Sequence, residues 1–191
     1  MDKSSKEFLI KKIENNPKDI MAHGNLGNMH FNEERYEEAI EAYQKVIELD
    51  PEQVAAYNNL GNAYAKQGKY EEAIEAYQKV IELDPDETAT LYNLGNVHSE
   101  KERYEEAIEA YQKVIELDPE QVAAYNNLGN AYAKQGKYEE AIKVYQTAIE
   151  LNPGQVAEYS NLINAYKRTL QNQIRKRPFG FLRKLFSIFR K

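Results

Sequence analysis

The chain has 191 residues, of which 42% are hydrophobic and 29% are charged, a composition typical of a globular protein rather than a disordered one. It has no cysteine and only three histidines, which excludes a disulfide framework, a thiolate zinc site and a cysteine nucleophile. All 31 acidic residues but only 16 of the 25 basic residues lie in residues 1–158, so this body carries −15 and the last 33 residues carry +9. Such asymmetry is typical of an interaction tail.

The same counts bear on location. No run of 18 or more hydrophobic residues is present, which argues against a membrane-spanning helix. The N-terminus lacks the apolar stretch of a secretory signal. We therefore expect a soluble, cytoplasmic protein.

The sequence repeats itself with a period of 34 residues. The string from Tyr36 to Ile74 recurs without a change from Tyr104 to Ile142, and a weaker copy at half that offset divides each block in two. The motif N-L-G-N recurs at Asn25–Asn28, Asn59–Asn62, Asn93–Asn96 and Asn127–Asn130. A fixed period of this length is the signature of a repeat architecture.

Each unit predicts two helices. In the second unit, residues with the spacing of one helix face recur at Tyr57, Leu60, Gly61 and Tyr64, and a second such face runs from Tyr70 to Ile81. Gly68 separates the two helices, and Pro85 ends the second because proline disfavours helical geometry in the residue before it. Glycine within a helix costs roughly 0.8–1 kcal/mol relative to alanine. The recurrence of Gly61 as Gly27, Gly95 and Gly129 therefore predicts that the paired helix approaches closely.

The 34-residue unit resembles the tetratricopeptide repeat and is close to the consensus of that family. The resemblance covers residues 18–155, with four units at 20–53, 54–87, 88–121 and 122–155. It implies an all-α fold, an α-solenoid in which helix–turn–helix units stack into a right-handed superhelix. Residues 1–17 resemble the second helix of a partial repeat, and residues 156–177 resemble a capping helix. The capping helix departs from the glycine pattern at Ile163, which fits the lack of a second helix beside it.

We find no set of residues suited to catalysis. His30 and His98 stand where the other units carry Tyr64 and Tyr132, two units apart, so we interpret them as packing residues rather than as metal ligands. Adjacent glutamates open the second helix of each unit, where they favour the positive end of the helix dipole. The sequence therefore predicts that the protein is not an enzyme and uses no cofactor or metal.

Two asparagines, three residues apart, share a helix face in every first helix and in the capping helix. In tetratricopeptide arrays the first helices line a concave groove, so the resemblance implies two asparagine ladders along it. The candidate groove residues are Asn25, Asn28, Asn59, Asn62, Asn93, Asn96, Asn127, Asn130, Asn161 and Asn164. An amide offers both a donor and an acceptor, which suits the backbone of an extended peptide. The alternative interpretation is that these asparagines hold neighbouring turns together.

One subtype of the family can be tested from the sequence. Repeats that grip chaperone C-termini resemble one another in carrying lysines and an arginine that clamp a carboxylate. The matching positions here hold Gly24, Asn25, Asn59, Ala89 and Asn93. Because none of these residues is charged, the sequence disfavours this subtype.

Residues 178–191 form a basic amphipathic tail. If they are helical, its apolar side consists of Phe181, Leu182, Leu185, Phe186, Ile188 and Phe189. A helix this short is marginal alone in water, so we expect the tail to bury that side on a surface. The candidate surfaces are the acidic repeat body in cis or in trans, an anionic membrane and a protein partner of the calmodulin type. A disordered end is the remaining interpretation, and nucleic acid is disfavoured because the acidic body repels phosphates.

The leading prediction for function is a non-catalytic scaffold for protein–protein interaction, whose concave groove binds a peptide or a helical segment of a partner. The first alternative is membrane-surface docking, or self-assembly into a homo-oligomer, through the cationic tail. The second alternative is a designed consensus repeat protein with no natural ligand, because mutational drift normally blurs a duplication of this length.

Overall fold

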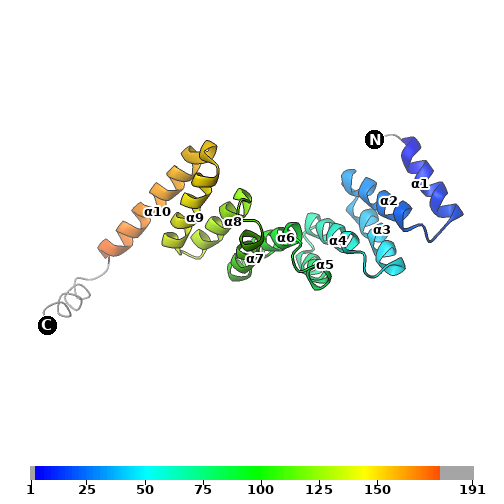
Figure 1. Ribbon diagram of the computed structural model, residues 1–191, viewed down its shortest axis with the longest axis horizontal. Coiled ribbons are helices and arrows are strands. Elements are labelled where there is room, and N and C mark those ends of the chain that lie inside the picture. The colour runs from blue at the N-terminus through cyan, green and yellow to red at the C-terminus, as the bar shows by residue number, and fades with distance from the viewer. Residues whose placement is uncertain (1–2, 177–191) are drawn as a thin grey trace. The chain divides into compact units, whose positions relative to one another are not determined.

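The computed structural model describes residues 3–176, and within this range the chain is all-helical, with no β-strand. The helices are α1 (Lys3–Asn15), α2 (Ile20–Asn32), α3 (Tyr36–Leu49), α4 (Val54–Lys66), α5 (Tyr70–Leu83), α6 (Thr88–Glu100), α7 (Tyr104–Leu117), α8 (Val122–Lys134), α9 (Tyr138–Leu151) and α10 (Val156–Lys176) (Figure 1). A short 3₁₀ turn, Pro153–Gln155, precedes α10. The pairs α2–α3, α4–α5, α6–α7 and α8–α9 each form a helix–turn–helix hairpin, which confirms the predicted all-α repeat fold.

The chain divides into two compact units, Met1–Pro119 and Glu120–Lys191. In the first unit, α1 packs on α2, α3 on α4 and α5 on α6, so the second helix of one hairpin is covered by the first helix of the next. In the second unit, α10 packs on α9 in the same order. Each hairpin therefore buries its apolar side against a neighbour, as stacked repeats do.

Local sequence explains where the helices begin and end. Asp19 caps α2, because its Oδ1 accepts a hydrogen bond from the Ala22 N–H at 2.9 Å. Two glutamates occupy the first turn of α3, α5, α7 and α9, where the helix dipole favours negative charge. At the other end, α5 stops at Leu83, and Asp84, the residue before proline, has extended backbone with φ of −141°.

The turn inside each hairpin uses a left-handed residue at the same place in every unit. Gly68 and Gly136 have φ of 73° and 75° there, while Glu34 and Glu102 have φ of 60° and 56°. Glycine adopts this conformation readily, whereas a residue with a Cβ is strained by roughly 1–2 kcal/mol. The first and third hairpins therefore form the same turn with a less suitable residue.

The glycine inside each first helix packs against a tyrosine ring of the paired helix. A Cβ on Gly27 would lie 2.6 Å from Tyr43 Cε1, and one on Gly61 would lie 2.5 Å from Tyr77 Cε1. The same contact recurs between Gly95 and Tyr111 and between Gly129 and Tyr145, at 2.6 Å in both cases. No side chain larger than hydrogen fits these distances without movement of the ring, so the predicted close approach is confirmed.

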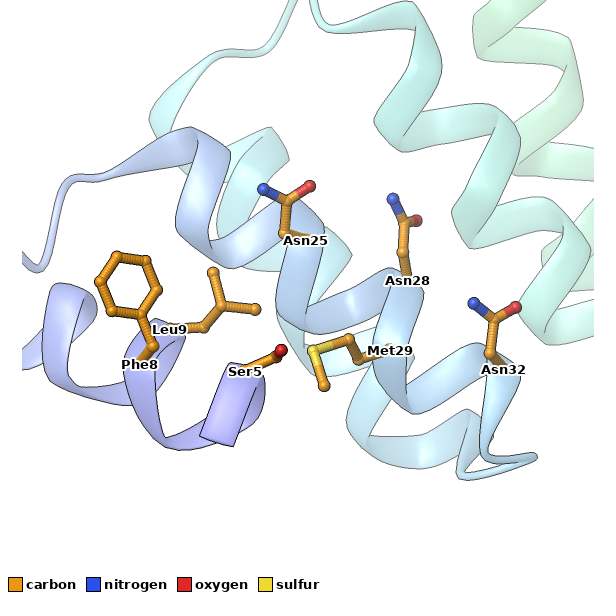
Figure 2. A pocket seen from close by; sticks show the side chains of 7 residues that line it. All are labelled: Ser5, Phe8, Leu9, Asn25, Asn28, Met29 and Asn32. Carbon is orange, nitrogen blue, oxygen red and sulfur yellow. The ribbon is translucent and has the colours of Figure 1, made fainter. Parts of the chain in front are cut away.

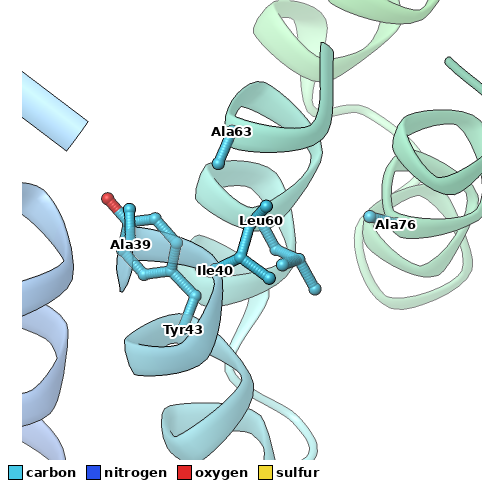
Figure 3. Close-up of a cluster of buried hydrophobic side chains, with 6 residues drawn as sticks. All are labelled: Ala39, Ile40, Tyr43, Leu60, Ala63 and Ala76. Carbon is cyan, nitrogen blue, oxygen red and sulfur yellow. The ribbon is translucent and has the colours of Figure 1, made fainter. Parts of the chain in front are cut away.

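The core continues from one hairpin to the next (Figure 3). One cluster joins α3, α4 and α5 through Ala39, Ile40, Tyr43, Leu60, Ala63 and Ala76. In the second unit, the Tyr145 ring of α9 stacks on the Tyr159 and Tyr166 rings of α10, with centroids 5.6 and 6.2 Å apart. Ile163, the residue that replaces the motif glycine, is buried in that cluster and packs toward α9.

The terminal helices differ from those between them. A shift of 34 residues places Leu9 of α1 where α3 carries Tyr43, but no first helix precedes α1 within the described residues. Phe8 of α1 is 61% exposed, as expected for a second helix whose partner is absent from the range 3–176. The longest helix is α10, with 21 residues, and no helix in the range 3–176 combines the length and apolarity needed to cross a membrane.

Candidate functional site

The second asparagine of each N-L-G-N motif accepts a hydrogen bond from the tyrosine that packs on the motif glycine. The Tyr43 hydroxyl donates to Asn28 Oδ1 at 2.8 Å, and the Tyr77 hydroxyl donates to Asn62 Oδ1 at 2.7 Å. The equivalent bonds, Tyr111 to Asn96 and Tyr145 to Asn130, measure 2.8 and 2.6 Å. Burial raises the pKa of Tyr43 to about 12, so this hydroxyl keeps the proton that it donates at neutral pH.

The first asparagine of a motif donates to the second asparagine of the preceding motif. Asn59 Nδ2 lies 3.2 Å from Asn28 Oδ1, and Asn93 Nδ2 lies 3.0 Å from Asn62 Oδ1. These bonds join α2 to α4 and α4 to α6, the first helices of consecutive hairpins. In the first unit, the structure therefore brings these candidate residues into two hydrogen-bonded pairs that both include a residue of α4, and we call the four residues together the asparagine line (Asn28, Asn59, Asn62 and Asn93).

The asparagine line stays accessible to solvent. Asn28 is exposed, as is its neighbour Asn25, and Asn59, Asn62 and Asn93 are half-buried. The other candidates are similarly accessible: Asn96 and Asn127 are half-buried, and Asn130 and Asn164 are exposed. Asn161 lies in α10. The bonds agree with the interpretation that these residues hold neighbouring turns together, and their exposure leaves amide groups at the surface.

Three cavities open beside the start of the asparagine line. One, of about 510 Å³, lies between α1 and α2; Figure 2 shows the apolar side chains Phe8, Leu9 and Met29 among its lining residues. A second, of about 310 Å³, is lined by Asn28, Phe31, Asn32, Tyr43, Asn59 and Asn62. The third, of about 200 Å³, lies among α2, α3 and α4 and is lined by Ile20, Met21, Gly24, Asn25, Asn28, Tyr43, Val46, Gln53, Ala55, Ala56 and Asn59. None of the three linings contains Asp, Glu, Lys or Arg.

The smallest of these three cavities, which we call the Gly24 cavity, lies beside a glycine that is absent from the predicted groove residues. A Cβ on Gly24 would meet nothing closer than Val46 Cγ2, at 3.9 Å, so the space beside this glycine is open. The equivalent residues 34 and 68 positions later are Asn58 and Tyr92. Comparison of the units at fixed spacing was therefore the signal that could have identified Gly24.

A fourth cavity, of about 520 Å³, lies between α4 and α5 and, unlike the first three, is lined by charged residues. Its aromatic and apolar side includes Tyr57, Leu60 and Tyr64, and its rim carries Glu72, Glu75, Glu82 and Lys79. Lys79 is paired with Glu82 on the same helix, and Lys45–Glu48 and Lys113–Glu116 repeat this pair on α3 and α7. Charge thus concentrates on the second helices, while the first helices present amides.

The histidines shared by the first and third hairpins behave as packing residues. His30 is buried and His98 is half-buried, and burial lowers the pKa of both. Lys6 and Arg35 lower the pKa of His30 further. In the part of the chain that the structure describes, no group of three or more His, Cys, Asp or Glu residues could hold a metal ion.

The predicted tail anchor lies outside the described residues, which end at Lys176. It comprises Phe181, Leu182, Leu185, Phe186, Ile188 and Phe189. Membrane docking and self-assembly through this tail therefore stay predictions from the sequence.

The stacked hairpins, the glycine–tyrosine contacts and the line of surface amides define a helical-repeat protein. The sequence models of the tetratricopeptide repeat match residues 52–120 and 92–156, and a third model, described as TPR repeat, matches residues 27–68. The chain belongs to the tetratricopeptide repeat family.

Solved structures of this family are similar to the chain. A crystal structure of MamA is 30% identical, has a TM-score of 0.74, and aligns over 78% of this chain and 87% of its own. MamA from Desulfovibrio magneticus RS-1, from residue 41 to its end, is 25% identical with a TM-score of 0.74, over 78% and 85% of the two chains. The first TPR of Spaghetti (RPAP3), bound to the HSP90 peptide SRMEEVD, is 29% identical with a TM-score of 0.58, over 64% and 96%. A comparison with curated proteins gave no match.

Proposed function

We propose that the chain is a non-catalytic interaction scaffold that binds an extended peptide along the first helices of its repeats. The observation that supports this function best is the asparagine line, whose amides are hydrogen-bonded to one another and still reach the surface. Amides pair with the backbone groups that every peptide carries. A row of them therefore suits a peptide ligand regardless of most of its side chains.

The packing around the asparagine line favours binding further. Asn28 is held by the hydroxyl of Tyr43, which is only 2% exposed, and Asn62 is held by Tyr77, which is 1% exposed. Side chains fixed in this way lose little further freedom when a ligand arrives, and preorganisation of this kind lowers the cost of association.

The comparison with Spaghetti (RPAP3) supports a peptide as the ligand class, since that relative is bound to the HSP90 peptide SRMEEVD. We expect the ligand of the present chain to differ in charge from that acidic peptide. The positions matching a carboxylate clamp hold Gly24, Asn25, Asn59, Ala89 and Asn93, and the cavities beside the asparagine line are uncharged. We therefore infer an uncharged segment rather than an acidic C-terminus.

The affinity expected from the amides is modest. A net hydrogen bond contributes about 0.5–1.5 kcal/mol. Association costs several kcal/mol before any gain appears, so we expect dissociation constants on the order of micromolar.

The test is selection of peptides from a random library on the immobilised full chain, followed by titration of the selected peptides against two triple variants. The first replaces Asn25, Asn59 and Asn93, the first asparagines of the three motifs in the first unit, with alanine. The matched control replaces Gln44, Gln78 and Gln112, amides of the second helices, with alanine. Circular dichroism checks that both variants keep the helical content of the parent chain.

We expect the asparagine variant to lose at least tenfold in affinity and the glutamine variant to bind like the parent chain. Equal binding to all three proteins would place the ligand elsewhere and would overturn the groove assignment. Failure to select any peptide with micromolar affinity would count against the function itself.

A further inference from the structure

We propose that the Gly24 cavity is a binding site for one uncharged aromatic side chain of a partner peptide. This inference rests on the proposed function, because it assigns a residue of the peptide that the asparagine line binds. It adds a specificity to that line, whose amides alone do not distinguish one peptide sequence from another.

In the third hairpin, a ring of the same chain already occupies the place that we propose for the partner's ring. Tyr92 of α6 occupies the position equivalent to Gly24, and its ring lies against the ring of Tyr111 on α7, with centroids 5.9 Å apart and planes tilted by 56°. Tyr111 is the equivalent of Tyr43, which lines the Gly24 cavity. In the first hairpin the glycine removes the covering ring and leaves the site beside Tyr43 open to a ring from another molecule.

The second hairpin fills the same position in a different way. Asn58 is the equivalent of Gly24 there, and its Oδ1 accepts a hydrogen bond from the Thr90 hydroxyl of α6 at 3.1 Å. Of the three hairpins in the first unit, only the first therefore has this position without a side chain. The proposed site occurs once in that unit, so it fixes which residue of the peptide lies at α2.

The size and the charge of the cavity agree with an aromatic occupant. Its volume is about 200 Å³, and an apolar cavity of about 150 Å³ is enough to hold benzene. Ile20, Val46 and Ala56 give it apolar walls beside Tyr43, and no charged residue lines it. A charged side chain would lose its hydration there without gaining an ionic partner, so the site selects against one.

The cavity is also continuous with the asparagine line. Asn28 and Asn59, which are bonded to each other, line the cavity as well. A peptide whose aromatic side chain enters beside Gly24 therefore places its backbone next to these two amides. The following residues of the peptide can then extend toward α4 and α6, where Asn62 and Asn93 form the next bonded pair.

The test uses the methionines as reporters, because the chain has only three. Met21 lines the Gly24 cavity, whereas Met29 lines the separate cavity between α1 and α2. The full chain, labelled with ¹³C at the methionine methyl groups, is titrated with N-acetyl-phenylalanine amide. N-acetyl-alanine amide serves as the probe without a ring, and N-acetyl-glutamate serves as the probe with a charge.

Two variants close the cavity while keeping side chains that the fold already accepts. Gly24→Tyr introduces the residue that the third hairpin carries at this position, and Gly24→Asn introduces the residue that the second carries. The space beside Gly24 accepts a Cβ, since the first atom that it would meet is 3.9 Å away, and circular dichroism checks that both variants keep the helical content of the parent chain. We expect the phenylalanine probe to shift the Met21 signal saturably, to leave Met29 unchanged, and to bind at least tenfold more weakly to both variants.

Absence of a saturable Met21 shift, or an equal shift in Gly24→Tyr, would overturn the proposal. A peptide selected on the full chain separates this failure from failure of the proposed function. If that peptide loses affinity with the asparagine variant but binds Gly24→Tyr like the parent chain, the cavity proposal is wrong and the groove assignment holds. If it responds to neither change, both are wrong.

Discussion

The first and third hairpins, α2–α3 and α6–α7, share their internal packing but differ at the surface of their first helices. Both place a glycine against a buried tyrosine, a histidine in the first helix, and a glutamate in the left-handed turn. They differ at Gly24, which leaves a cavity, and Tyr92, which covers Tyr111. Positions between paired helices are thus fixed, because a Cβ added to Gly27 or Gly95 would lie 2.6 Å from the tyrosine ring, whereas the position of Gly24 and Tyr92 can change without disturbing this packing.

The largest expected effect on stability comes from making the same substitution, to alanine, at the two glycines of α2. Gly24→Ala should stabilise the protein by about 1 kcal/mol, because alanine is the better helix former and meets no close atom there. Gly27→Ala should instead destabilise it by about 1–3 kcal/mol, because the new Cβ collides with the Tyr43 ring. Urea unfolding measures both values. Stabilisation by both changes would contradict the close helix contact.

A smaller effect is expected at the left-handed turn. Glu34→Gly and Glu102→Gly should each raise the free energy of unfolding by about 1 kcal/mol, since glycine relieves the strain of positive φ. The reverse change, Gly68→Glu, should lower it by a similar amount in the second hairpin. Thermal or urea unfolding of the three single variants gives the comparison. A stabilising Gly68→Glu would show that the turn is not strained.

The smallest effect concerns the histidines and pH. Burial lowers the pKa of His30 and His98 in the folded state, while the unfolded chain keeps a value near 6.5. The unfolded state therefore binds more protons, and stability falls as the pH drops below about 6.5 toward the folded pKa values.

Replacing both histidines with tyrosine, the residue at the same place in the second and fourth units, removes this contribution. The unfolding free energy of the double variant should change less between pH 7.5 and pH 5.5 than that of the parent chain. Carboxylates whose pKa values are lowered, such as Glu38 and Glu71, lose their contribution at more acidic pH and so affect this window little. Identical pH profiles would mean that the histidines are protonated equally in both states.

The sequence predicted the fold well because the signals that determine it are local. The spacing of apolar residues defined the helix faces, and Gly68 marked the turn that its φ of 73° confirms. The recurring glycine inside each first helix indicated a close contact, and the structure identifies the tyrosine ring that makes it.

The candidate site was less predictable because its contacts join distant residues. Periodicity placed Asn28 and Asn59 on equivalent helix faces, but it did not reveal that one donates to the other across 31 residues, or that Tyr43 donates to the same oxygen. The Gly24 cavity depends on α2, α3 and α4 together. Such features follow from the packing of hairpins and not from the pattern within one of them.

Two amide oxygens of the asparagine line each accept two hydrogen bonds, which gives this line a chemical polarity. Asn28 Oδ1 accepts from Tyr43 and Asn59, and Asn62 Oδ1 accepts from Tyr77 and Asn93. An amide oxygen has two lone pairs, so both acceptors are saturated and these two side chains can offer a ligand only N–H groups. If a peptide binds along this line, Asn28 and Asn62 should consequently recognise the carbonyl groups of its backbone and not its amide protons. A ligand N-methylated there would keep its affinity, and its modified peptide bonds would resist proteases.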